Sequence, residues 1–551
     1  MGIKKKKKNA PAIKINIKPL IIAFIQWLVT TVLQVDRLFF SYDQVNRINV
    51  TVKVLYLIFL IIIWCFVFEV VKRVRSGDEK WKRGLLIFVV YFSVMLVFML
   101  VLWPGTWSWD DTTTINRIAD YKTWFPWQHV ITGIYQDVLL QILPFPGGIV
   151  LLQNVIISVC VAFVVGKLEY SFHLGRIKIT AVDILIKLIP FLLPPVLMYQ
   201  FSGYRMGLYL YLELVMLVML IGAWTDEKAW SIKYSVLFSS LCVIVSCWRT
   251  EAFMYIPIAC VLIHFVKKSA ISHERKEMCI SILIIGFFCM SRIQSMNLGN
   301  SDYNIISLMR PCVELVRIAD TEKDKEELEA INKVADLQVI YDNPTENGEN
   351  IYWNTACVRT RNDDPDDNYS SEDYSGFIKA LVRLSLKYPA VVIAERMNLF
   401  LCSCGVKGNY ASNVVLSAER FEPKNNRGIL LDSEKNSWKI NQPLMYDARI
   451  SLINLLGFRN KDGSYNEGIR RVVWNAIIPI LVLIVGWILM LIKKEWYYAG
   501  VLSAILIKLP MIILTQPGGW FMYMLSFYFL GYVLLVYGVL LLRAKGLSRK
   551  K

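Results

Sequence analysis

Long runs of apolar residues constrain this sequence more than any other feature. The run GLLIFVVYFSVMLVFMLVLW, residues 84–103, contains no charged side chain. A helix of about 20 apolar residues crosses the roughly 30 Å of hydrocarbon in a bilayer, and only helices and closed barrels satisfy their backbone hydrogen bonds there. Such runs recur, and 55% of the 551 residues are hydrophobic. The chain is therefore predicted to be an all-α polytopic membrane protein.

We predict about twelve transmembrane helices, of which the fifth, seventh, eighth and ninth are short or interrupted. They lie near residues 18–35, 50–71, 84–103, 148–166, 181–199, 206–224, 233–248, 252–266, 278–293, 472–492, 497–514 and 520–542.

Basic residues predict the orientation, because Lys and Arg collect in short cytoplasmic loops. Residues 4–8, the loop 72–83, the pairs 267–268 and 493–494, and the tail RAKGLSRKK all fall on one side. We therefore expect both termini in the cytoplasm and the protein in the plasma membrane. The net charge of +17 is explained by this topology and by anionic membrane lipids, so no nucleic-acid partner is expected. No cleavage site follows the first apolar run, which is expected to be a retained span.

The predicted spans divide the chain into three parts. Residues 1–293 form an N-terminal transmembrane module with a first external loop at 104–147, residues 294–470 an external soluble domain, and residues 471–551 a C-terminal transmembrane module. The first loop should form interfacial helices, since Asp110 or Asp111 can cap a helix beginning at Thr112 and residues 131–143 are apolar.

The external domain is expected to be mainly helical. TEKDKEELEAINKVADL has Glu and Lys at helical pair spacing, with Thr321 as a possible cap. Residues 370–401 suggest two helices broken at Pro389, the second apolar enough to touch the membrane. The external cysteines fit no metal motif and are expected to be unpaired; they are Cys312, Cys357, Cys402 and Cys404.

Two adjacent acids at the end of the third span are the first candidates for chemistry. Asp110 and Asp111 follow WPGTWSW, and charge so close to hydrocarbon is costly unless it is used or paired. They could form a general base, a metal site or an ion path, or they could only cap a helix. Trp109 beside them is a candidate substrate contact. His129 shares the loop and could be a ligand or a proton carrier, or an interfacial residue without a role.

Further polar residues gather on the same predicted face. Arg205 opens the sixth span, Arg249 and Glu251 lie in the turn CWRTEAF, and Lys508 lies in the outer half of the eleventh span. Such cations could bind a phosphate. Snorkelling to the interface is the alternative and is preferred for Arg205 taken alone, and the deep Glu213 could pair with one of them.

Two other patterns bear on function. The turn TQPGGWFMY contains Gly518 and Gly519, which could let the backbone approach a ligand or could only end a helix. The chain has no P-loop, GxSxG, HExxH or dinucleotide fingerprint. Any activated donor is therefore expected to be a lipid already in the membrane.

The motifs have a family resemblance. PGTWSWD followed by QHVITGIYQ resembles the pattern PG-x4-D, then HP-x2-T, of a bacterial branch of multi-pass proteins related to the GT-C class of membrane glycosyltransferases, and WRTEAF resembles its R-x-E-G element. By this match Asp110 takes the place of the essential acid, His129 of the loop histidine, and Arg249 and Glu251 of the Arg and Glu.

The sequence also departs from that pattern. Val130 stands where Pro is usual and Ala252 where Gly is usual, and the last external turn lacks the usual Arg. Recognition of a donor phosphate is therefore left to Lys508, Arg205 or Arg249.

The resemblance implies an inverting GT-C-like enzyme. It would move a sugar from a polyprenyl-phosphate donor to a glycan or lipid acceptor outside the membrane. Asp110 would act as general base or hold a divalent ion, Mg or Mn, and no other cofactor is implied. A polysaccharide polymerase is the runner-up, and a lipid-linked oligosaccharide flippase or transporter the third possibility. A transporter should carry polar groups near the bilayer midplane, where only Glu213 and Lys187 are candidates, so the external cluster favours an interfacial enzyme.

Overall fold

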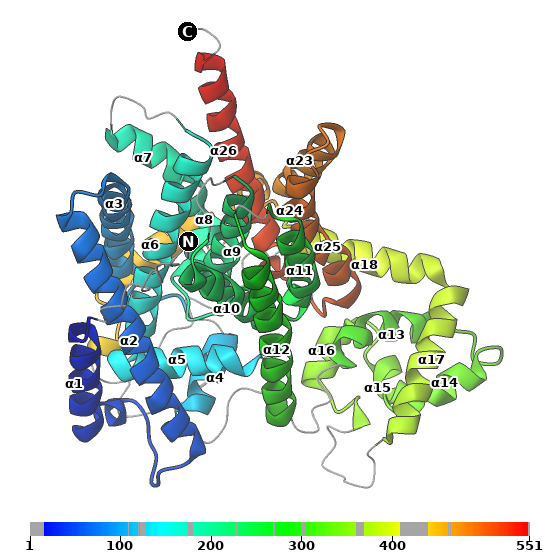
Figure 1. The fold of residues 1–551 in the computed structure, drawn as a ribbon. Helices are drawn as coiled ribbons and strands as arrows, with labels where there is room; N and C mark the ends of the chain where they lie inside the picture. The colour runs from blue at the N-terminus through cyan, green and yellow to red at the C-terminus, as the bar shows by residue number, and fades with distance from the viewer. Residues whose placement is uncertain are drawn as a thin grey trace, which may run out of the picture.

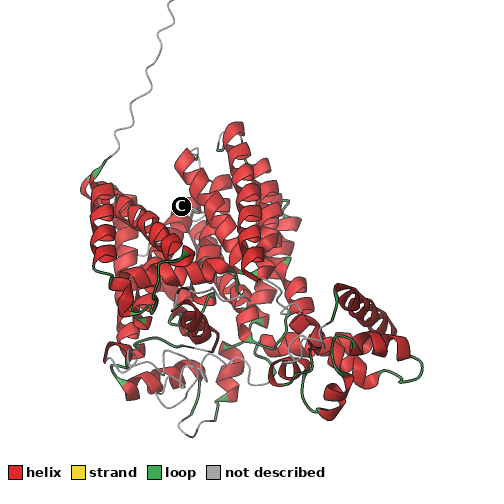
Figure 2. Ribbon diagram, turned by 90° about the horizontal axis from the view of Figure 1, so that it is seen from below, coloured by secondary structure: helices red, strands yellow, loops and turns green. Residues whose placement is uncertain are grey.

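The fold is helical throughout the part of the chain that can be described (Figures 1 and 2). A computed structural model describes residues 16–107, 109–119, 121, 128–174, 180–225, 230–267, 270–298, 305–359, 369–407, 439–460, 462 and 464–548. In these ranges there is no strand, and the only β-bridges are the isolated pairs Ala335–Val358 and Arg459–Tyr465. The predicted all-α class is confirmed.

Eight segments are long and apolar enough to cross a membrane. They are α2 (Arg47–Arg75), α3 (Glu79–Leu102), α6 (Pro146–Ser171), α9 (Met206–Thr225), α12 (His273–Leu298), α22 with α23 (Glu467–Val473 and Ile477–Ile492), α24 with α25 (Trp496–Leu506 and Lys508–Thr515), and α26 (Leu525–Ser548).

The predicted count of twelve is not confirmed. A ninth candidate is a bent pair in which α7 (Thr180–Leu188) and the 3-10 helix η2 (Ile189–Leu192) meet α8 (Pro194–Gln200) at 72°. At the other three predicted positions the helices are apolar but shorter. These are α1 (Lys18–Val32), α10 (Ile232–Trp248), and η3 with α11 (Thr250–Met254 and Tyr255–Phe265).

Helix α3 shows how the sequence defines such a span. Asp78 caps its start by accepting hydrogen bonds from the amides of Lys80 and Trp81. The helix stops at Leu102, because the following Trp103-Pro104 step cannot continue a helical hydrogen-bond ladder. Its buried residues Tyr91, Met95 and Met99 recur every four positions, and Tyr91 bonds Gln200 of α8 at 2.9 Å, while the other side of the helix stays exposed and apolar, as contact with lipid requires.

A buried cluster of four charges lies where α3, α6 and α7 meet. Arg83 pairs with Glu169 at 2.7 Å and with Asp183 at 2.5 Å. Lys187 pairs with the same two acids at 2.7 Å and 2.8 Å. Two cations and two anions therefore compensate one another, which is how charges are retained away from water.

The bent span results from its prolines. Pro190, Pro194 and Pro195 remove amide donors and fix the backbone, so the helix stops, turns and resumes. The short α8 then delivers residues 201–205 to the end of α3. This arrangement positions the candidate site.

The first external loop forms two helices, α4 (Trp109–Ile118) and α5 (Val130–Ile142). The expectation that Asp110 or Asp111 precedes the helix as its cap is wrong, because α4 begins at Trp109 and both acids lie in its first turn. Carboxylates are favoured there by the positive end of the helix dipole.

The segment predicted to form an external domain has a core of its own between residues 305 and 384, formed around Met309, Val313, Ile331 and Phe377. Its helices are α13 (Ile306–Ile318), α14 (Lys325–Asn332), α15 (Leu337–Asp342), α16 (Gly348–Asn354), α17 (Ser371–Lys387) and α18 (Pro389–Ser403). The predicted break at Pro389 is confirmed. The predicted acidic helix starts at Lys325, after a turn in which Asp320 accepts from the amides of Glu322 and Lys323.

Farther along, the 3-10 helix η9 (Lys439–Asn441) and α21 (Tyr446–Gly457) return to the spans, where α21 contacts α3 and α8. Cys312, Cys357, Cys402 and Cys404 are all free thiols.

Candidate functional site

The PGT stretch after α3 docks on the loop that follows the bent span. Thr106 donates its hydroxyl hydrogen to the carbonyl of Met198 at 2.9 Å and its amide to the carbonyl of Phe201 at 2.8 Å. Gly105 has φ +118°, and a Cβ there would lie 2.7 Å from the Phe201 carbonyl oxygen. Only glycine allows this approach.

Besides Asp137 of α5, the segment between α3 and α6 has one more carboxylate whose side chain is described, that of Asp111. Its residue is 1% exposed, and its Oδ2 accepts a 2.5 Å hydrogen bond from the hydroxyl of Ser202. That hydroxyl in turn accepts from the amide of Tyr204 at 3.0 Å. The side chains of Asp110 and Trp109 lie outside the described residues, so their predicted roles stay predictions.

The loop carrying Ser202 is held from several sides. Gln153 donates to the carbonyls of Gln200 and Ser202, both at 2.9 Å, and Gln136 of α5 donates to the carbonyl of Gly203 at 2.9 Å. Trp107 is packed so closely that a Cβ on Gly203 would lie 2.4 Å from its ring. Ser202 is thus fixed against Asp111 before any ligand arrives.

Arg249 reaches the same place from the end of α10. It is buried, its Nε donates to Glu251 at 2.8 Å, and its guanidinium lies 5.5 Å from the ring centre of Tyr523. Tyr199 of α8 interacts electrostatically with both Asp111 and Arg249. The structure therefore brings the predicted acid and the predicted arginine to one region.

Lys508 lies deeper and is already paired. Its ammonium forms an ion pair with Glu213 of α9 and donates to the hydroxyl of Ser526 at 3.1 Å. Glu213 also accepts from the hydroxyls of Tyr255 at 2.5 Å and Tyr209 at 3.1 Å. The predicted pairing of Glu213 with a nearby cation is present. Lys508 belongs to an internal network and also interacts with Glu251.

Arg205 is half-buried on the Ser202 loop. Its carbonyl accepts from the indole of Trp248, the residue before Arg249, at 2.9 Å. Its Nε is buried without a hydrogen-bond partner in the described structure. A buried donor of this kind is costly, so Arg205 is the described site cation best suited to an incoming anion.

His129 occupies a different position. Its Nδ1 accepts from the amide of Ile131 at 3.2 Å and caps α5, while the amide of Val130 donates to Gln294 of α12 at 2.7 Å. Burial lowers the pKa of His129 to about 4, and its Nε2 is buried without a hydrogen-bond partner in the described structure. The ring is therefore neutral at physiological pH, and no described contact joins it to Asp111.

Several residues in this region were not predictable from the sequence. Ser202 and Tyr204 follow an apolar helix, and Tyr523 lies in an aromatic run that is typical of an interfacial belt. Arg449 of α21 donates to the Gly105 carbonyl at 2.9 Å, so the second external segment also reaches the PGT stretch. These partners are far apart in the chain, and no spacing rule could have found them.

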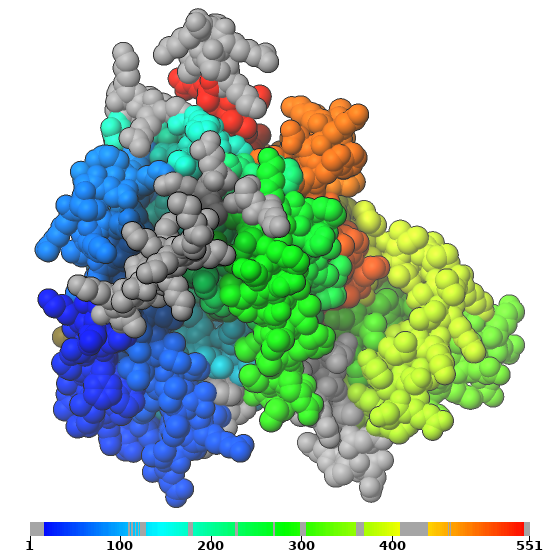
Figure 3. All heavy atoms as spheres, in the orientation of Figure 1, coloured from blue at the N-terminus to red at the C-terminus, as the bar shows by residue number. Residues whose placement is uncertain are grey.

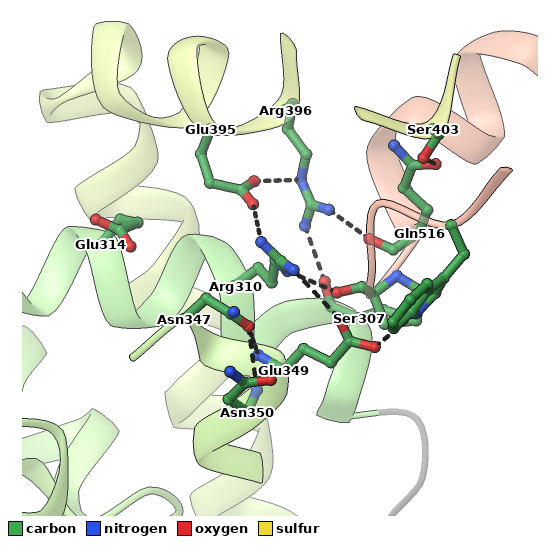
Figure 4. A network of polar contacts seen from close by, with 12 residues as sticks. Ser307, Arg310, Glu314, Asn347, Glu349, Asn350, Glu395, Arg396, Ser403 and Gln516 are labelled. Carbon is green, nitrogen blue, oxygen red and sulfur yellow. Dashed lines mark hydrogen bonds and ion pairs between the residues drawn. The ribbon is translucent and has the colours of Figure 1, made fainter. Parts of the chain in front are cut away.

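The turn after α25 is packed against helices α13, α16 and α18 (Figure 4). Arg310 donates to the carbonyl of Pro517 at 2.8 Å, and Arg396 donates to that of Gln516 at 2.9 Å. A Cβ on Gly518 would lie 2.5 Å from an oxygen of Glu349. The glycine is thus packed against a neighbouring side chain, and the approach of this backbone to a ligand stays a prediction.

The predicted divalent ion has no set of three ligands among the described residues. Among the described residues no three His, Cys, Asp or Glu side chains lie together as metal ligands, and Asp111 already bonds Ser202. The side chain of Asp110, the expected ligand, lies outside the described residues. Mg or Mn therefore stays a prediction, and the mechanism below uses neither.

Comparison with protein families, with curated proteins and with solved structures finds no match to this chain.

Proposed function

We propose that the protein is a GT-C-like, inverting glycosyltransferase of the plasma membrane, with twelve spans and both termini in the cytoplasm. It moves a sugar from a polyprenyl-phosphate donor to a glycan or lipid acceptor on the external side. One observation carries the proposal: the buried carboxylate of Asp111 bonds Ser202 of the loop after α8, and Trp248, the residue before the buried Arg249, bonds Arg205 of the same loop.

Asp111 is the proposed general base. Its Oδ2 is held by Ser202, which orients the carboxylate toward the loop. The acceptor oxygen attacks the anomeric carbon as its proton passes to the carboxylate, and the bond from that carbon to the phosphate oxygen breaks. A positioned base of this kind contributes roughly 10²–10⁴-fold to the rate.

The leaving group is a lipid phosphate, and cations must stabilise its charge. Arg205 supplies a buried Nε, and Arg249 a second guanidinium near the same loop. Guanidinium groups suit phosphate because they present fixed donors in a plane. Glu251 orients Arg249, while Lys508 acts through its network with Glu213.

The test is sugar transfer by the full-length protein in nanodiscs, with a panel of synthetic short-chain polyprenyl-phosphate sugars. Asp111→Asn should lower transfer by about 10²–10⁴-fold at an unchanged melting temperature. Asp110→Asn is compared beside it, and Glu329→Gln, on an exposed face of α14, is the control. If Asp110→Asn alone abolishes transfer, the base is reassigned to Asp110.

If the wild-type protein consumes none of the donors, the proposal is overturned. Polymerisation of a lipid-linked oligosaccharide would then identify a polymerase, and its movement across vesicles a flippase.

A further inference from the structure

Helix α18 exposes an apolar face and buries a charged side chain, which is unusual for a helix in water. Ala390, Ile393, Ala394 and Met397 are exposed and recur at the spacing of one helical face. The other side of the helix buries Arg396 together with Leu399 and Ser403. A helix at the surface of a soluble domain has the reverse arrangement, with charges outward and apolar residues inward.

The charged face of α18 is engaged inside the protein. Arg396 donates to the carbonyls of Gln516 at 2.9 Å and Ser307 at 2.8 Å, and it pairs with Glu395 at 3.4 Å (Figure 4). These bonds fix the rotation of the helix about its axis. The apolar face must therefore stay outward and cannot roll into the domain.

The exposed apolar face of α18 adjoins the apolar surface of a candidate span, α24 with α25. Helix α18 packs against α25, whose Pro510 and Leu514 are exposed. In Figure 1 it leaves the bundle beside α25 and runs across, rather than along, the direction of α26. In the space-filling view its yellow surface meets the orange-red atoms of the C-terminal spans (Figure 3).

The apolar surface extends past the break at Pro389 onto the end of α17. Leu386 is 77% exposed and Val382 53%, beside Ile393 at 62% and Met397 at 45%. Isolated exposed apolar residues are ordinary, but a continuous patch marks an interaction surface.

We propose that this face of α18, with Val382 and Leu386, lies among the acyl chains of the external leaflet as an in-plane helix. Amphipathic helices bind membranes in this way, with the apolar face about 5–10 Å into the boundary. The occupant is lipid rather than a second copy of the chain, because the patch is continuous with the exposed side of a candidate span. Lys379 and Arg383, exposed on α17, are placed to meet anionic headgroups.

The proposal is tested by depth-dependent quenching in nanodiscs. A keto amino acid at Ile393, or at Met397 as a second position, is coupled to an environment-sensitive dye, which leaves the eleven native cysteines unlabelled. Lipids brominated near the headgroup or near the chain end act as quenchers, with iodide as the aqueous quencher. Val485, exposed on α23, is the bilayer control, and Lys325, with a side chain 72% exposed, is the aqueous control.

At Ile393 and Met397 we expect loss of emission with brominated lipid, greater for shallow than for deep bromines, and little loss with iodide. Quenching by iodide alone, as at Lys325, would overturn the proposal. Protection from both quenchers, with cross-linked dimers, would overturn it in favour of a second copy. The outcome does not depend on any sugar transfer by the protein.

Discussion

Ser202 donates its hydroxyl hydrogen to Oδ2 of Asp111 across 2.5 Å, and this bond joins the first external loop to the end of the bent span. Removing the hydroxyl deprives a buried carboxylate of a partner. Ser202→Ala should therefore reduce stability by about 1–3 kcal/mol and lower sugar transfer, but by less than Asp111→Asn does. Thermal unfolding and the transfer assay measure the two effects. Ser295→Ala is the control, because its exposed hydroxyl bonds a carbonyl of its own helix, and it should change neither stability nor sugar transfer. A Ser202→Ala protein as active as wild type would show that Ser202 does not position Asp111.

The ion pair of Lys508 and Glu213 should show strong coupling. Lys508→Met leaves a buried carboxylate without its cation and should cost about 3–5 kcal/mol. Glu213→Gln combined with Lys508→Met should recover much of this loss, since neither charge then remains. A double-mutant cycle on melting temperatures in nanodiscs measures the coupling. The exposed pair Glu69 and Arg73 serves as control, with coupling below about 1 kcal/mol, and equal coupling in the two pairs would contradict the prediction.

His129 should make the protein sensitive to mild acid. Its pKa in the folded protein is about 4, below the ordinary value of about 6.5, so the unfolded chain takes up the proton first. The contribution of neutral His129 to the free energy of unfolding is therefore complete above about pH 6.5 and is lost as the pH falls toward 4. His129→Asn keeps a capping acceptor but does not titrate.

Between pH 7 and pH 5 the variant should gain roughly 2 kcal/mol relative to wild type. Melting curves across this range provide the measurement. A constant difference between the two proteins would show that His129 does not titrate in this way.

Gly518 should not tolerate a side chain. Ala at this position places its Cβ against Glu349 and the indole of Trp520, which should cost roughly 1–3 kcal/mol and loosen the external domain from the last turn. Limited proteolysis and melting temperature report the change. Gly376→Ala is the matched control, because a Cβ there meets nothing within 4 Å and should slightly stabilise α17. Unchanged proteolysis of Gly518→Ala would contradict the packing role.

Local patterns predicted much of the helical structure. Apolar runs located α3, α6 and α26 because length and composition decide whether a helix can be a span. Pro389 located a helix break because proline affects the backbone wherever it stands. The apolar runs did not predict how many helices are long enough to cross a membrane, since α10 and α11 are short apolar helices whose role depends on their neighbours.

The candidate site was predictable only where its contacts are local. Arg249 and Glu251 are two residues apart and form the expected group. Ser202 and Asp111 meet because the bent pair α7–α8 and helix α4 converge, and nothing in either segment encodes the other. The same applies to Arg449, which reaches Gly105 from a helix far along the chain.

The pairing of Glu213 with Lys508 also has a consequence for biosynthesis. The two residues are 295 positions apart, so at about 5–20 residues per second the ribosome needs roughly 15–60 s to supply the cation. During this interval α9 is in the translocon or the bilayer with an uncompensated carboxyl group, which is unfavourable there. Nascent chains that end before Lys508 should therefore depend on a membrane insertase or chaperone to hold α9, and release from it should follow translation of the last two spans.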